Sequence, residues 1–243
     1  MDVVAIIQAR IGSSRLPGKV LADLGGRSML AQVLRRVGRA ESLRRLVVAT
    51  SISAADDPIE QECRRLGAVC FRGPEEDVLA RYHQAAVAHR AEAVLRITAD
   101  CPLVDPGVID LVVGRFLAER PDYASNTLRR TFPRGLDAEV FTAAALKQAF
   151  HGAVEPYQRA HVTPYLHQHP QQFRLLAVTG EVDYSKHRWT VDTAEDLALV
   201  RAIGARLADG ATAGWRDVLR LVADEPALAA MNRNVHQKTL LEG

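Results

Sequence analysis

Short apolar runs alternate with amphipathic stretches along the first half of the chain. The runs are rich in β-branched residues and too short for helices, which is typical of buried strands. They predict strands at Val3–Ile7, Leu46–Thr50, Val69–Phe71 and Ala93–Ile97. Because a helical pattern follows each run, the sequence predicts an α/β fold whose mostly parallel sheet has helices on both faces.

Several of the intervening helices have a recognisable start. Ser28 can cap a helix whose apolar face begins at Met29. Asp57-Pro58 and Asp105-Pro106 each combine a capping carboxylate with a proline at the first helical position. The expected helices cover Met29–Arg39, the stretch from Asp57 to Gly67, Asp77–His89 and the stretch from Asp105 to about Leu117.

The alternation weakens after Tyr123. Residues 126–187 hold an arginine-rich loop and a histidine-rich segment, with expected elements at Ala138–Phe141 (strand), Ala143–Phe150 (helix) and Phe173–Val178 (strand). The regular pattern then returns with a strand at Arg188–Asp192 and a helix from Thr193 to Leu207. We therefore expect one domain over residues 1–243, with 126–187 as an excursion from it.

Composition narrows the functional classes. The chain has 243 residues, which is enough for one large α/β domain, and its net charge of +2 is too small to indicate nucleic-acid binding. The three cysteines lack a C-x-x-C spacing, so neither a zinc cage nor a disulfide framework is expected. The N-terminal apolar run has the character of a strand rather than of a signal peptide, and nothing approaches a membrane span. We expect a cytoplasmic protein without a membrane partner.

The strongest chemical signal is the loop that follows the first strand, Gln8-Ala9-Arg10-Ile11-Gly12-Ser13-Ser14-Arg15-Leu16-Pro17-Gly18-Lys19. Such a loop lies at the carboxyl edge of the sheet, where open α/β folds bind ligands. Main-chain N–H groups of small residues can surround a phosphate, and basic side chains add charge that suits a triphosphate. The small residues are Gly12, Ser13 and Ser14, and the basic ones are Arg10, Arg15 and Lys19.

Two known phosphate motifs do not fit this loop. The spacing from Gly12 to Gly18 is one residue too long for a P-loop, and Val20 stands where that motif needs a hydroxyl for the metal. The G-x-G-x-x-G dinucleotide fingerprint is absent. An arginine-rich surface turn is the alternative to phosphate binding.

Two aspartates are expected at the same edge of the sheet. Asp100 follows a buried strand and precedes Pro102, and Asp192 follows the apolar run before the last predicted helix. Mg²⁺ takes one or two carboxylates together with phosphate oxygens, so the pair predicts a metal site. The alternative is a capping role for each aspartate in a turn or at a helix start.

The loop after the first strand and several later segments resemble a known family. The loop and the sequence that follows it, up to Leu21, are similar to the opening motif of the spore-coat polysaccharide biosynthesis protein F family, in the superfamily of CMP-Kdo and CMP-sialic acid synthetases. The resemblance continues through Asp77–Tyr82, Ile97–Leu103, Phe132–Phe141, His161–Tyr165 and Trp189–Leu197. It implies a Rossmann-like nucleotide-diphospho-sugar transferase sheet, in which residues 126–187 form an acceptor-binding and dimerisation region of a homodimer.

The resemblance also implies roles for individual residues. Main-chain groups of Gln8 and Ala9 hold the base, with Arg81 and Thr98 near the base or ribose. Arg10, Arg15 and Lys19, with the loop residues Gly12, Ser13 and Ser14, bind the phosphates. Asp100 and Asp192 hold Mg²⁺, so the residues expected to take part in catalysis are Lys19, Arg10 and Asp100. The acceptor residues are Asn126, Arg134, Asp137, Arg159 and His161.

The implied reaction is transfer of CMP from CTP to a small anionic or sugar-like acceptor, with release of pyrophosphate. An anionic acceptor needs no general base, and the sequence names none. Two alternatives remain open: a glycosyltransferase that uses a preformed nucleotide-sugar, and a nucleotide-binding protein without catalytic activity.

Overall fold

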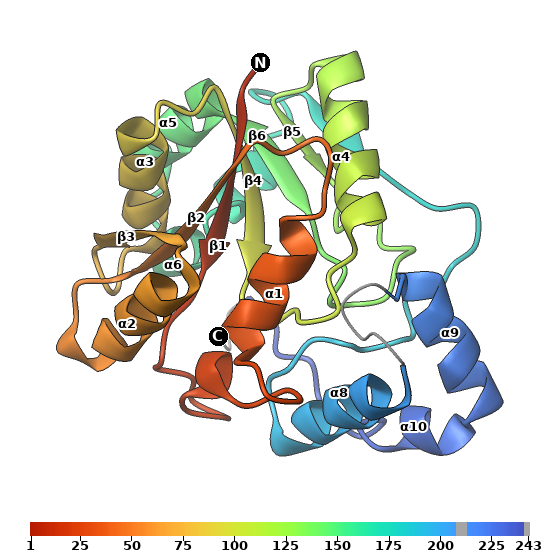
Figure 1. Cartoon of the computed structure of the whole chain (residues 1–243). Coiled ribbons are helices and arrows are strands. Elements are labelled where there is room, and N and C mark those ends of the chain that lie inside the picture. Colours follow the sequence, from red (N-terminus) through yellow and green to blue (C-terminus); the bar gives the residue numbers. More distant parts are fainter. Residues whose placement is uncertain (208–212, 241–243) are drawn as a thin grey trace.

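The computed structural model describes residues 1–207 and 213–240, and its centre is a seven-stranded sheet (Figure 1). The strand order is β3-β2-β1-β4-β6-β5-β7. Neighbours among β1 to β4 are parallel, β6 is antiparallel to β4 and β5, and β7 is parallel to β5. The strands are β1 (Val3–Gln8), β2 (Arg45–Ser51), β3 (Val69–Gly73), β4 (Ala93–Thr98), β5 (Tyr123–Ser125), β6 (Glu139–Thr142) and β7 (Leu175–Ala177). The predicted α/β class and mostly parallel sheet are confirmed.

Helices cover both faces of the sheet, because successive side chains of a strand point to opposite sides. In β1, Ala5 and Ile7 pack in one apolar cluster, while Val4 and Ile6 pack in another. The first cluster includes side chains of α1 (Met29–Val37), α2 (Asp57–Leu66) and α4 (Pro106–Glu119). The second includes α3 (Val78–Ala88), α5 (Ala143–Gly152) and α7 (Pro164–Gln168), together with Val162, which follows α6 (Pro156–His161). Burial on both faces explains why the strands form continuous apolar runs.

A third layer closes one end of the sheet (Figure 1). It contains α8 (Ala194–Arg206), α9 (Trp215–Asp224) and α10 (Pro226–Ala230), which share an apolar cluster with Trp189 and Val191. The short 3-10 helix η1 (Lys19–Leu21) lies at the end of the loop that follows β1. None of the helices in the described ranges has the length and apolar character needed to cross a membrane.

The predicted helix starts are confirmed with one correction. Ser28, Asp77, Asp105 and Thr193 each accept a hydrogen bond from an N–H in the first turn of the following helix. Asp57, predicted as a cap, lies inside α2 instead. The preceding residue, Asp56, does not cap the helix either, because its carboxylate accepts hydrogen bonds from the main chain of Ile11 and from the Ser51 hydroxyl.

The strand predicted at Arg188–Asp192 is wrong. This segment is extended but contributes only an isolated β-bridge, between Arg188 and Arg134. Its main chain crosses the carboxyl end of the sheet: the Trp189 N–H donates to the main-chain carbonyl of Arg134 (2.7 Å), and the Val191 N–H donates to the main-chain carbonyl of Asp100 (2.8 Å). The apolar pattern reflects packing of Trp189 and Val191 against α8 and α9 rather than pairing in the sheet. The sequence also missed β5, which is only three residues long.

Candidate active site

A polar cavity of about 670 Å³ opens at the carboxyl ends of β1 and β4. The chain passes from β1 outward through β2 to β3 and then returns to the other side of β1 as β4, so the strand order reverses between these two strands. Open α/β sheets bind ligands at this kind of switch point. Lining residues from the first half of the chain are Gln8, Arg10, Ser13, Ser14, Arg15, Lys19, Val20, Glu76, Val78, Arg96, Thr98, Ala99, Asp100 and Cys101.

Lys19 lies at the centre of the charged groups. Its Nζ is 3.0 Å from Asp100 Oδ2 and 2.8 Å from Asp192 Oδ1, and it donates to the carbonyl oxygen of Val191 at 2.8 Å. Burial alone lowers the pKa of Lys19, but the two carboxylates outweigh burial and raise it. The cation and both carboxylates, which are far apart in the sequence, therefore converge on one point.

Neighbouring groups fix the two carboxylates. The Thr98 hydroxyl donates to Asp100 Oδ1 at 2.5 Å. Burial alone raises the pKa of Asp100, but the Lys19 charge and this hydrogen bond lower it. Asp192 Oδ2 is held by Arg15 at 3.1 Å and by Arg188 at 2.7 Å. Both aspartates line the cavity, and neither caps a helix by its side chain.

The residues of the loop after β1 differ in whether they reach the cavity. Arg10, Ser14 and Arg15 line the cavity, whereas Gly12 is outside its lining. The Ser13 N–H donates to the Ile11 carbonyl at 2.8 Å, so this arrangement does not direct it at a phosphate. Of the three small residues predicted to surround a phosphate, Ser13 therefore has its N–H engaged within the loop.

The main chain predicted to hold the base is largely engaged in the sheet. The Ala9 N–H donates to Ala49 at 3.2 Å, and the Gln8 carbonyl accepts from the Ala99 N–H at 2.9 Å. The side-chain oxygen of Gln8 is buried and has no hydrogen-bond partner in the described chain. Since Gln8 lines the cavity, its side chain is the polar group that remains for a ligand there.

The opposite wall comes from the second half of the chain. Three of the predicted acceptor residues, Arg134, Asp137 and His161, line the cavity. Asp137 is held by Arg130 through two hydrogen bonds of 2.5 and 2.8 Å. Burial lowers the pKa of His161, so this imidazole is biased toward its neutral form. Its Nε2 is buried without a partner in the described chain.

Three other predicted residues do not line the cavity. Arg81 is fully buried, and its guanidinium donates to the Pro74 carbonyl at 2.8 Å. Asn126 is fully buried and bonds the main chain of Leu136 and Ala138. Arg159 forms a salt bridge with Asp77 at 2.6 Å and lies over the ring of Phe150. Each of these side chains holds together segments that surround the cavity.

The cavity wall contains a buried ion pair that was not predicted from the sequence. Arg96 in β4 forms a salt bridge with Glu139, its register partner in β6, and the Tyr123 hydroxyl donates to the same carboxylate at 2.6 Å. Burial alone lowers the pKa of Arg96, but Glu139 raises it. A signal was present, because Arg96 and Thr98 are two residues apart in one strand and so share a face. The sequence offered no such signal for Gln237, Lys238, Thr239 and Leu240, which also line the cavity.

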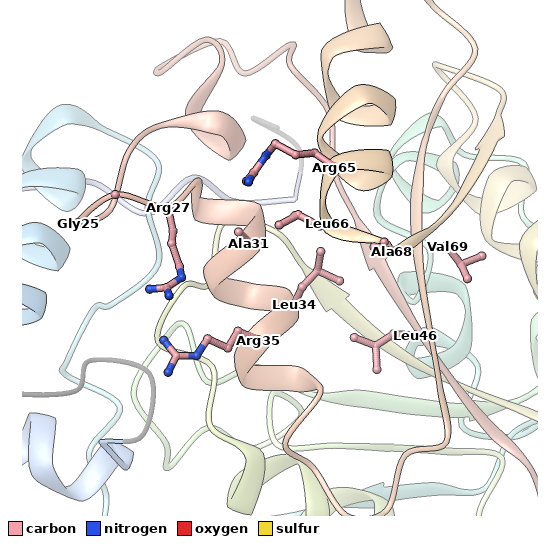
Figure 2. A pocket seen from close by; sticks show the side chains of 12 residues that line it. Gly25, Arg27, Ala31, Leu34, Arg35, Leu46, Arg65, Leu66, Ala68 and Val69 are labelled. Carbon is pink, nitrogen blue, oxygen red and sulfur yellow. The ribbon is translucent and has the colours of Figure 1, made fainter.

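A second and larger hollow, of about 830 Å³, lies between α1 and the corner that joins α2 to β3 (Figure 2). Leu34, Leu46 and Val69 lie along it, and arginines stand around them (Figure 2). Its lining contains no carboxylate, histidine or cysteine. This lining offers no group for metal binding or acid–base chemistry. The hollow is therefore not the candidate active site, although its volume is larger than that of the polar cavity.

Comparisons with known proteins agree with the polar cavity. A family model for cytidylyltransferase matches residues 4–203. The chain belongs to the cytidylyltransferase family. It is therefore a CTP-dependent nucleotidyltransferase, as the sequence predicted, and the glycosyltransferase alternative is not favoured.

Similar proteins span nearly the whole chain. An uncharacterized protein of Methanocaldococcus jannaschii is 36% identical, covering 100% of this chain and 99% of the relative. The spore coat polysaccharide biosynthesis protein SpsF of Bacillus subtilis is 32% identical, covering 94% of this chain and 97% of the relative. A solved cytidylyltransferase structure from Leptospira borgpetersenii superposes with a TM-score of 0.91 at 32% identity, covering 98% and 100% of the two chains.

Proposed function

We propose that the cavity binds CTP with Mg²⁺ and transfers CMP to a small anionic or sugar-like acceptor. The observation that supports this most is the convergence of Lys19, Asp100 and Asp192 beside the arginines of the loop after β1. A cation next to two carboxylates matches a site that must hold both a metal and a polyphosphate.

The residues fit a divalent cation. Asp100, Asp192 and the Val191 carbonyl direct three oxygens at one positively charged atom, the Lys19 ammonium nitrogen. In the described chain no group of three or more histidine, cysteine, aspartate or glutamate side chains is placed to hold a metal. Mg²⁺ commonly takes only one or two carboxylates and completes its shell with phosphate oxygens and water. Asp100 and Asp192 are its proposed ligands, and Lys19 would then be available to the phosphates.

The proposed reaction is an in-line displacement. An acceptor oxygen attacks the α-phosphorus of CTP, and a new P–O bond forms as the bond to the bridging oxygen breaks. An anionic acceptor brings no proton to the attacking oxygen, and a hydroxyl acceptor releases its proton to solvent. That oxygen leaves with the electron pair as pyrophosphate. Lys19, Arg10 and Arg15 face the phosphates and stabilise the charge that develops on them. When bound, Mg²⁺ supplies further charge stabilisation at the α-phosphate and the leaving group.

The acceptor is proposed to occupy the side of the cavity formed by residues 126–187. Arg134 and His161 line this side, with Arg96 in the floor. The two carboxylates there, Asp137 and Glu139, are each paired with an arginine, so Arg134 is the proposed donor to a carboxylate, phosphate or sugar hydroxyl of the acceptor. The relative from Bacillus subtilis, a spore coat polysaccharide biosynthesis protein, supports a carbohydrate acceptor. Homodimer formation through residues 126–187 and a cytoplasmic location stay predictions.

Pyrophosphate release from CTP and Mg²⁺, measured with a panel of acidic sugars, phosphosugars and phosphonates, tests this function. Asp100→Asn and Asp192→Asn keep the side-chain shape and remove one charge each, so both should lower turnover by about 10²-fold or more. Asp224→Asn, at the exposed end of α9 and away from the cavity, is the matched control. Near-normal turnover of either active-site variant at limiting Mg²⁺ would show that this residue does not hold the metal.

A further inference from the structure

Residues 235–240, which we call the strap, run back from α10 to the catalytic cavity. Four of its residues, Gln237, Lys238, Thr239 and Leu240, line that cavity together with the loop after β1. At its far end the main chain of Leu240 interacts with His161, on the acceptor side. The strap therefore reaches both walls of the cavity, although it is distant in sequence from either.

The chain just before the strap is firmly attached. Asn232, which is 6% exposed, donates from Nδ2 to the Arg188 carbonyl at 3.0 Å and to Asp196 Oδ1 at 2.8 Å. Asp196 is itself fully buried and salt-bridged to Arg188. A buried amide with two such partners fixes the direction in which the chain leaves α10.

Two arginines connect the strap to the proposed metal ligand Asp192. Arg15 donates to the His236 carbonyl at 3.2 Å and forms a salt bridge with Asp192 at 3.1 Å. Arg188 bonds the Gln237 side chain and forms a salt bridge with Asp192 at 2.7 Å. The strap is thus held by the same side chains that hold the catalytic carboxylate.

Lys238 is the charged residue of the strap in this cavity, and it lies on the phosphate side. Lys238 also lines an adjoining hollow of about 460 Å³, together with Arg15 from the loop after β1. Arg15 and Lys19 already form salt bridges with Asp192, whereas Lys238 forms none with any residue in the described ranges. Its ammonium can therefore bind an anion without first losing an ion pair.

We propose that Lys238 binds the β- and γ-phosphates of CTP and, after transfer, the pyrophosphate that leaves. This assignment rests on the proposed function of the cavity. As the bond between the α-phosphorus and the bridging oxygen breaks, the electron pair moves onto that oxygen, and the Lys238 ammonium stabilises the charge of the departing pyrophosphate. The strap carries this cation to the part of the cavity where Arg10, Arg15 and Lys19 come from the loop after β1.

Binding measurements test the assignment without knowledge of the acceptor. Lys238→Met keeps the stem and removes the charge, and calorimetry compares its affinity for CTP, CMP and pyrophosphate, each with Mg²⁺. We expect about tenfold weaker binding of CTP and pyrophosphate, the size typical of one charge-assisted hydrogen bond, and less than twofold change for CMP. Lys238→Arg should restore most of the affinity, and Lys147→Met, on the exposed face of α5, is the control.

The outcomes separate this assignment from the proposed function. If the unaltered protein binds CTP and Lys238→Met binds CTP equally well, the role of Lys238 is wrong and the function stands. Equal weakening of CMP and CTP would also overturn it, because CMP lacks the β- and γ-phosphates. If the unaltered protein does not bind CTP, the proposed function itself fails.

Discussion

The two walls of the cavity are built in different ways. The nucleotide wall consists of Gln8–Lys19 and Thr98–Asp100, which directly follow the central parallel strands β1 and β4. The acceptor wall consists of side chains from residues 126–187, where short strands, turns and short helices alternate. Charged groups of the nucleotide wall point into the cavity, whereas much of the polarity of residues 126–187 holds the segment together. The difference indicates that the ends of the parallel strands fix the positions of the residues in the nucleotide wall, whereas tertiary contacts fix those in the acceptor wall.

Lys19→Met should have the largest effect, because it removes the cation at the centre of the nucleotide wall. We expect kcat for CMP transfer to fall by about two to three orders of magnitude, while KM for CTP changes much less. The comparison requires steady-state kinetics with an acceptor from the panel above. A steep rise in KM with unchanged kcat would make Lys19 an anchor for the bound phosphates, and Arg10 or Arg15 the better candidate for the catalytic charge.

The structure adds a stability effect that the sequence did not predict. In the described chain Lys19 is the one cation within salt-bridge distance of Asp100, so methionine leaves that carboxylate without its charged partner. The variant should melt at a lower temperature than the parent. If Asp100 and Asp192 hold Mg²⁺ as proposed, the ion competes with the ammonium for them, and Mg²⁺ should raise the melting temperature of Lys19→Met more than that of the parent. Equal shifts would argue against Asp100 and Asp192 as metal ligands.

The same contrast explains how much the sequence could predict. A loop that follows a parallel strand lies at the carboxyl edge of the sheet, so the sequence predicted that Lys19 and Asp100 lie at the same edge. Asp192 was placed correctly beside them although its strand was wrong, because the segment crosses the strand ends that it was expected to join. For Arg159 and Asn126 residue type alone could not distinguish a ligand contact from a structural one, since their partners are chosen by tertiary packing.

Gly135→Ala should have the largest effect on the stability of the acceptor wall. Gly135 has φ +106°, and a Cβ there would lie 2.7 Å from the main chain of both Trp189 and Thr190. Neither backbone can move freely, because Trp189 is hydrogen-bonded to Arg134. We expect a loss of about 3 kcal/mol or more in the free energy of unfolding, measured by denaturant titration. Gly204→Ala, in α8 with open space at its Cβ, is the control and should be neutral or slightly stabilising.

Arg134 and Arg159 provide a smaller and sharper test of the acceptor wall. Both were predicted to bind the acceptor, but only Arg134 lines the cavity. Arg134→Met should raise KM for an anionic acceptor about tenfold, since it removes a charged donor. Arg159→Met should lower the melting temperature, because Asp77 and Phe150 lose their partner, and should leave the acceptor KM nearly unchanged. The reverse pattern would mean that the acceptor enters from the side of α6.

The smallest expected effect concerns the base, on the nucleotide wall. The main chain of Gln8 and Ala9 is engaged in the sheet, and the buried Gln8 side-chain oxygen remains without a partner in the described chain. An acceptor oxygen favours cytosine, whose amino group donates, over uracil, which carries a carbonyl at the same position.

Melting temperatures with each nucleotide test this preference. In the presence of Mg²⁺, CTP at about ten times its Kd should stabilise the protein by about 1.4 kcal/mol, which raises Tm by about 3–5 °C. UTP, ATP and GTP at the same concentration should stabilise it by less. Gln8→Leu should reduce the difference between CTP and UTP. Equal shifts for all four nucleotides in the unaltered protein would leave triphosphate binding in place and remove Gln8 as the residue that selects cytosine.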